Sequence, residues 1–149
     1  MAIGGALVAA LWATFHLHAY LGLGVPTIVR AFTDPSLPHA AFAWKAALTA
    51  LTVGVGFVGG EVTPLFFVGA TLANALAGPL GLPLTLAAAV GMAAMFGAAA
   101  NTPLALSIMA AELVGWPAFL PTLLVAHLAT LLKGRHDLYA GQRSRRLSA

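Results

Sequence analysis

Apolar residues run through almost the whole chain in blocks that are separated by short polar or proline-containing breaks. The blocks cover residues 2–32, 41–58, 64–82, 84–100, 103–114 and 117–132. A straight helix that spans a membrane needs about 20 apolar residues, and the later blocks are shorter than this because prolines interrupt them. These prolines are Pro64, Pro79, Pro83, Pro103, Pro117 and Pro121. Since proline begins or breaks a helix, the pattern predicts broken helices.

Composition places these helices in a membrane. Hydrophobic residues make up 60% of the 149 residues and charged residues only 7%, whereas a soluble domain carries about 25% charged residues. We therefore expect one all-α transmembrane domain over residues 1–149, a bundle of short, broken and re-entrant helices. Backbone groups freed at the breaks must be buried in protein or line a polar cavity, as they do in many transporters.

Charge is concentrated at the C-terminal end of the chain. Its basic residues are Lys133, Arg135, Arg143, Arg145 and Arg146, with Asp137 as the acidic residue among them. Beside a membrane segment such a cluster indicates a cytoplasmic tail rather than a site for nucleic acid. The expected location is the cell membrane, with several passes, and residues 33–40 (TDPSLPHA) form a polar linker outside it.

Two breaks have the same form, EVTPLFF at residues 61–67 and NTPLALS at residues 101–107. In each, a polar residue and a threonine precede a proline, which is typical of a capped helix start. Unpaired amides and the helix dipole at such a start favour an anion. Glycines before the first start would let backbone approach a ligand closely, although glycines also serve helix packing in membranes. The helix-start residues are Gly59, Gly60, Pro64, Asn101, Thr102 and Pro103.

Three segments resemble, in order, motifs of one known family. They are GGEVTPLFFVGATLANALAG at residues 59–78, GMAAMFGAAANTPLALSIMAAELVG at 91–115 and HDLYAGQR at 136–143. The first looks like the family's Gly-x-Phe-x-Pro helix start, the second like its Ala-Pro-Leu helix with a trailing glutamate, and the third like its pore-tyrosine segment. The chain thus resembles the C-terminal half of the CLC family of chloride channels and proton-coupled anion antiporters. YLGLGVPTIV at 20–29 fits the start of that half.

The helix start departs from the family's usual motif in an informative way. Val62 stands where the family usually has phenylalanine, and Glu61 precedes it, so that GGEVTP is similar to the fluoride/proton antiporter branch. This resemblance implies that amides near Glu61 and Val62, with the hydroxyls of Thr63 and Tyr139, surround the central anion. It also implies that Glu61 handles fluoride or protons. A carboxyl desolvated beside an anion can be protonated and then donate a hydrogen bond to fluoride.

Each of these polar residues also has a structural interpretation. Glu61 could be a carboxylate that caps its own helix, and Thr63 could likewise be only a cap. Tyr139 could be an aromatic anchor at the membrane interface. Lys45, which follows Trp44 near the edge of its block, is expected to extend to the lipid headgroups.

The sequence indicates neither a metal site nor an enzyme. His16, His18 and His127 have no metal-ligand spacing and no carboxylate nearby, the chain has no cysteine, and we expect no cofactor. It contains no Gly-x-Ser-x-Gly motif, and Ser107 has no base beside it in sequence.

The family's other half, which supplies a gating glutamate in a Gly-Arg-Glu-Gly-type stretch, does not appear in these 149 residues. The resemblance implies fluoride or chloride transport with proton coupling by the complete protein, which is expected to be a homodimer in the lipid bilayer. The chain could be a fragment, a partner for a separate first-half chain, or one of several assembled copies. The alternative function is a non-transporting membrane fragment or an accessory subunit.

Overall fold

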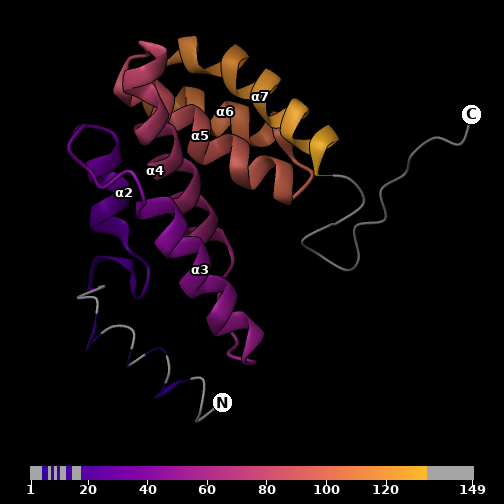
Figure 1. Cartoon of the computed structure of the whole chain (residues 1–149). Helices are drawn as coiled ribbons and strands as arrows, with labels where there is room; N and C mark the ends of the chain where they lie inside the picture. The colour runs from indigo at the N-terminus through magenta and orange to yellow at the C-terminus, as the bar shows by residue number, and fades with distance from the viewer. Residues whose placement is uncertain (1–4, 7, 9, 11–12, 15–17, 134–149) are drawn as a thin grey trace, which may run out of the picture.

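The computed structural model describes residues 5–6, 8, 10, 13–14 and 18–133, and within these ranges the chain forms helices and turns but no strand (Figure 1). The predicted all-α fold is confirmed. The elements are η1 (His18–Tyr20), α2 (Val25–Ala31), α3 (Ala41–Gly54), α4 (Val62–Leu80), α5 (Leu84–Ala99), α6 (Pro103–Val114), η2 (Trp116–Ala118) and α7 (Phe119–Leu132).

Most of these helices are too short to cross a membrane unaided, as the proline pattern predicts. Among the described residues, only α4, with 19 residues, is long and apolar enough to do so. The apolar helices α3, α5, α6 and α7 are shorter than a spanning helix of about 20 residues. Their ends must therefore be satisfied by other parts of the protein.

Prolines mark helix starts more often than helix breaks. Pro64 and Pro103 lie in the first turns of α4 and α6 as predicted, and Pro121 lies in the first turn of α7. The expectation that Pro79 cuts its block is wrong, because α4 continues through it to Leu80. Pro79 removes a bond only from the last turn, and α4 ends where Gly81 adopts a left-handed conformation, φ 64°.

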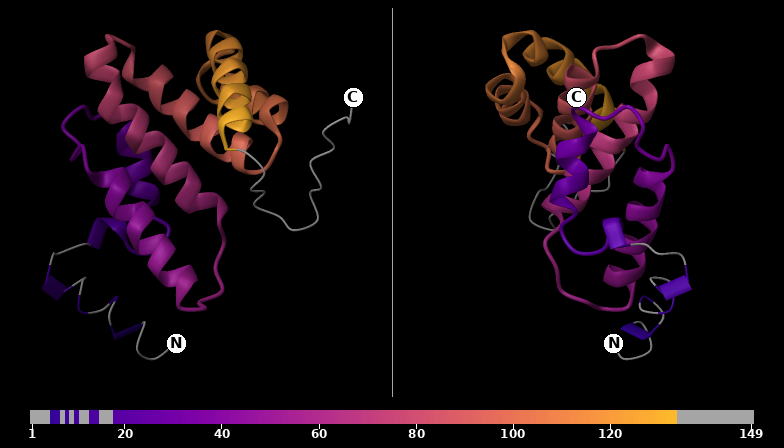
Figure 2. Two further views of the ribbon diagram at one scale, coloured as in Figure 1. Left: turned by 45° about the vertical axis from the view of Figure 1, so that its right-hand side comes forward. Right: turned by 90° about the vertical axis from the view of Figure 1, so that its left-hand side faces the viewer.

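Helix α4 lies in the middle of the arrangement, with α2 and α3 on one side and α5, α6 and α7 on the other (Figures 1 and 2). The small core residues Ala31, Ala70 and Ala88 bring α2, α4 and α5 together. A second cluster around Ala93, Ala110 and Ala118 joins α5 to α6 and η2. Because alanine side chains are short, these backbones approach closely, as is usual for helices in membranes.

Two glycines lie at a close crossing of α4 and α5. A Cβ atom at Gly69 would lie 2.3 Å from the carbonyl oxygen of Gly91, and a Cβ atom at Gly91 would lie 2.4 Å from the carbonyl oxygen of Gly69. Real Cβ atoms do not come this near to another atom, so only glycine fits at either position. This crossing fixes the position of α4, and with it the position of the α4 start.

Gly69→Ala should lower the free energy of unfolding by about 1–3 kcal/mol, because the new methyl group overpacks the crossing. Gly78→Ala is the matched control on the same helix, since a Cβ atom there meets no atom within 4 Å. It should leave stability unchanged or raise it by up to about 1 kcal/mol through helix propensity. Thermal unfolding in detergent measures both, and equal effects of the two variants would contradict the close crossing.

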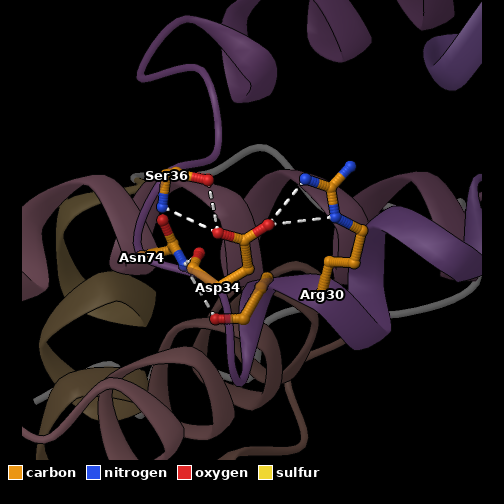
Figure 3. Close-up of polar contacts among 5 residues, drawn as sticks. Arg30, Asp34, Ser36 and Asn74 are labelled. Atoms are coloured by element: carbon orange, nitrogen blue, oxygen red, sulfur yellow. Dashed lines mark hydrogen bonds and ion pairs between the residues drawn. The ribbon is translucent and has the colours of Figure 1, made fainter.

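The linker between α2 and α3 is a polar turn, as the sequence predicts (Figure 3). The Arg30 guanidinium and the Ser36 hydroxyl and amide all donate to the Asp34 carboxylate. From α4, the buried Asn74 side-chain amide donates to the carbonyl oxygens of Ala31 and Asp34, each at 2.9 Å. These bonds satisfy carbonyl groups at the end of α2 and tie the linker to α4.

The hydrogen bonds from Ser36 and Arg30 lower the pKa of the Asp34 carboxyl from its ordinary 3.8 to about 2. Since the folded pKa lies below the ordinary value, the ionised carboxylate favours the fold. Its contribution is complete above about pH 4 and is lost as the pH falls towards 2.

Melting temperature measured between pH 2 and pH 6 should therefore fall at the acidic end. Asp34→Asn should remove part of that fall, because it removes the carboxylate that loses its charge. An identical acid profile for the wild type and Asp34→Asn would contradict a role for Asp34 ionisation.

Candidate anion site at the start of helix α4

The start of α4 leaves backbone amides without carbonyl partners. The first helical hydrogen bond runs from the Leu65 amide to the Glu61 carbonyl oxygen, at 3.3 Å. Within the described residues, the amides of Val62 and Thr63 donate to no backbone carbonyl group, and Pro64 has no N–H group. Two amides at the positive end of a 19-residue helix are thus available to an anion.

The chain that leads to this start is extended and exposed. After α3, Gly56 adopts a left-handed conformation, φ 86°, and residues 57–60 form no helix. A Cβ atom at Gly59 or Gly60 would meet no atom within 4 Å. The described part of the chain therefore leaves open space beside these two glycines, next to the unpaired amides.

Glu61 occupies the N-cap position of α4, but its side chain forms no capping hydrogen bond. The side chain of Glu61 is exposed and lines a cavity of about 280 Å³. The capping interpretation of Glu61 therefore lacks the bond on which it depends. Thr63, the second residue of α4, lies just inside the helix and is half-buried.

The cavity is open on one side and is lined by elements far apart in the sequence. Residues 20–22 form one wall, the face of α3 that carries Lys45, Thr49 and Thr52 forms another, and residues 57–61 with Pro64 complete it. The sequence-predicted residues Gly59, Gly60, Glu61 and Pro64 are thus brought together around one space. Val62 and Thr63 are not among the lining residues, but they lie in sequence between Glu61 and Pro64, which both line the cavity.

Lys45 is a charged residue of this cavity, and the expectation that it extends to lipid headgroups is wrong. Its side chain is only 3% exposed. The ammonium Nζ donates to the carbonyl oxygens of Tyr20, at 2.9 Å, and Gly22, at 2.5 Å, and lies 5.3 Å from the centre of the Phe67 ring. Its spacing from Leu48, Thr49 and Thr52, which share one helix face, is the signal that could have indicated an inward direction.

The second predicted helix start is separate from the cavity. Asn101 has a left-handed backbone, φ 55°, and the Thr102 amide donates to the Gly97 carbonyl oxygen at 2.9 Å, so these residues close the end of α5. Thr102 makes no side-chain cap bond to α6. The rings of Phe66 and Phe96, 5.3 Å apart, connect the two regions.

Among the predicted site residues, Tyr139 lies outside the described part of the chain. Its role in the anion site stays a prediction, as do the anion contacts of Glu61, Val62 and Thr63. Within the described part of the chain, no group of three or more potential metal-ligating side chains occurs.

Comparison with known proteins identifies the fold and its relatives. The sequence profile of the family described as "Voltage gated chloride channel" matches residues 1–134. The chain is 46% identical, over 94% of its length, to the "Chloride/fluoride channel protein" of Pseudomonas syringae pv. tomato and covers 32% of that protein. It superimposes with a TM-score of 0.81 on the "Crystal structure of a CLC-type fluoride/proton antiporter", at 34% identity, covering 93% of this chain and 35% of that one. The chain thus spans about a third of the length of these relatives.

Glu61→Ala should change the free energy of unfolding by less than about 0.5 kcal/mol, as is usual for an exposed side chain without partners. A capping carboxylate would instead cost about 1 kcal/mol on removal. Asn74→Ala is the positive control, because losing its two buried hydrogen bonds should cost about 1–3 kcal/mol. Urea or thermal unfolding of the three proteins distinguishes the two interpretations, and a loss near 1 kcal/mol for Glu61→Ala would restore the capping role.

Proposed function

The chain belongs to the voltage-gated chloride channel family, and from this premise we propose that it forms part of a membrane pathway for a halide anion, with the start of α4 at the anion site. The single observation that carries this proposal is the pair of unpaired amides of Val62 and Thr63, beside a cavity that is also lined by the buried, positively charged Lys45. Unpaired amides at a helix start are suited to a small anion.

The names of the relatives favour fluoride or chloride as the anion. One relative is described as a chloride/fluoride channel protein and the other as a fluoride/proton antiporter. Fluoride is the stronger hydrogen-bond acceptor, so a site made of N–H and O–H donors suits it. We propose fluoride as the first candidate and chloride as its competitor.

Each residue of the proposed site has a distinct task. The amides of Val62 and Thr63 and the Thr63 hydroxyl donate to the anion, and the Tyr139 hydroxyl adds a further donor. Glu61, which is exposed and lines the cavity, accepts or releases the proton. Once protonated, its carboxyl group can donate to fluoride, whereas the ionised carboxylate repels it.

The length of the chain relative to its relatives bears on how the complete protein is assembled. Since the chain covers about a third of each relative, we propose that transport requires further polypeptide, either in the same protein or as a separate first-half chain. We also propose a homodimer for the complete protein, a multi-pass topology and a cytoplasmic tail after Lys133, in line with its basic residues. A non-transporting fragment or accessory subunit is the alternative.

A chimera tests this function directly. The chain replaces the matching segment of the Pseudomonas syringae relative, and fluoride and proton fluxes are recorded from liposomes. The chimera should carry fluoride, whereas liposomes with the 149-residue chain alone should show no coupled flux. Absence of fluoride and chloride flux from a folded chimera would favour the accessory-subunit alternative.

Two variants of this chimera examine Glu61. Glu61→Gln keeps the size and hydrogen-bonding capacity of the side chain but cannot titrate, so anion flux should persist while its dependence on pH and proton movement changes. Glu61→Ala removes a hydrogen-bonding group as well and should weaken fluoride affinity about tenfold to a hundredfold. Unchanged anion affinity and proton coupling in both variants would show that Glu61 does not take part in transport.

A further inference from the structure

The cavity beside the α4 start contains a positive charge that has no negative partner. Lys45 lines this cavity and is 3% exposed. In the part of the chain that the structure describes, the ion pair found is Arg30 with Asp34, and no carboxylate lies within 4 Å of the Lys45 ammonium. Two of its three N–H groups donate to the carbonyl oxygens of Tyr20 and Gly22, which leaves one donor for another group.

A buried ammonium without an ion-pair partner raises the free energy of the folded protein, and this cost restricts the roles that Lys45 can have. Transfer of a charge from water to a protein interior is unfavourable unless the charge is compensated. The two carbonyl groups and the face of the Phe67 ring, 5.3 Å away, supply partial negative charge only. A full positive charge therefore remains on the wall of the cavity, where the low dielectric extends its effect.

Resting on the function proposed above, we propose that Lys45 sets the affinity of the transported anion, because its fixed charge attracts a halide ion into the cavity beside the unpaired amides of Val62 and Thr63. The anion supplies the missing negative charge, and the cation and the helix start act on it together. The anion-site residues proposed above at the helix start belong to α4 and the segment before it. Lys45 lies on α3 and therefore extends the site to a second helix.

A purely structural role of Lys45 would also explain part of the contacts around its ammonium group. The Lys45 ammonium joins α3 to residues 20–22, and Gly24, at φ 69°, packs so tightly on Phe67 that an added Cβ atom would lie 2.7 Å from the ring. A neutral donor could hold those carbonyl groups without the cost of a buried charge. The two roles therefore differ in whether the charge itself is needed.

Three substitutions in the chimera separate charge from hydrogen bonding. Lys45→Met removes both, Lys45→Gln keeps donors without charge, and Lys45→Arg keeps charge and donors. The apparent KM for fluoride should rise about tenfold to a hundredfold in Lys45→Met and Lys45→Gln, as expected for loss of a nearby charge. Lys45→Arg should remain within about threefold of the wild type. Melting temperature shows whether each variant is folded.

Lys133→Met is the matched control. The Lys133 ammonium also donates to backbone carbonyl groups, at 2.7 Å to Ala98, but Lys133 does not line the cavity. This variant should reduce stability and leave the fluoride KM unchanged. A wild-type KM in folded Lys45→Gln, or an equal rise in Lys133→Met, would overturn the role of the Lys45 charge. Absence of any flux in the wild-type chimera would instead overturn the proposed function, so the two failures are distinguishable.

Discussion

A helix that starts inside a membrane protein leaves amide groups without carbonyl partners, and the structure around α4 depends on this constraint. Lipid offers no hydrogen-bond acceptor, so these groups need protein, water or a ligand. The amides of Val62 and Thr63 donate to no backbone carbonyl group within the described residues, and the Glu61 side chain does not cap them. The open cavity beside them leaves room for the acceptor that the helix lacks.

The packing of α4 explains how this start is held in place. Gly69 and Gly91 allow α4 and α5 to approach so closely that no side chain fits between them, and Asn74 ties the other half of α4 to the linker after α2. Lys45 then joins α3 to residues 20–22 and lies over Phe67 of α4. Helices α3 and α4 and residues 20–22 thus meet at one cavity, although different interactions hold each of them in place.

Much of the fold could be predicted from the sequence, because it depends on local rules. Proline in a first turn identified the starts of α4 and α6, and polar turn residues identified the linker at residues 33–40. Pro79 misled the prediction because a missing amide in the last turn of a helix removes too little to end it. Lys45 was placed at the headgroups because its partners, Tyr20 and Gly22, lie more than twenty residues away in sequence. Contacts over such distances are not visible in local patterns.

Amide NMR of the chimera, selectively labelled with ¹⁵N at valine, threonine and leucine, tests most directly whether the α4 start binds the anion. On titration with sodium fluoride, the amide signals of Val62 and Thr63 should shift and saturate together. The amide signal of Leu104, at the start of α6 and outside the cavity lining, should move little. Shifts at Leu104 without saturable shifts at Val62 and Thr63 would contradict an anion site at the start of α4.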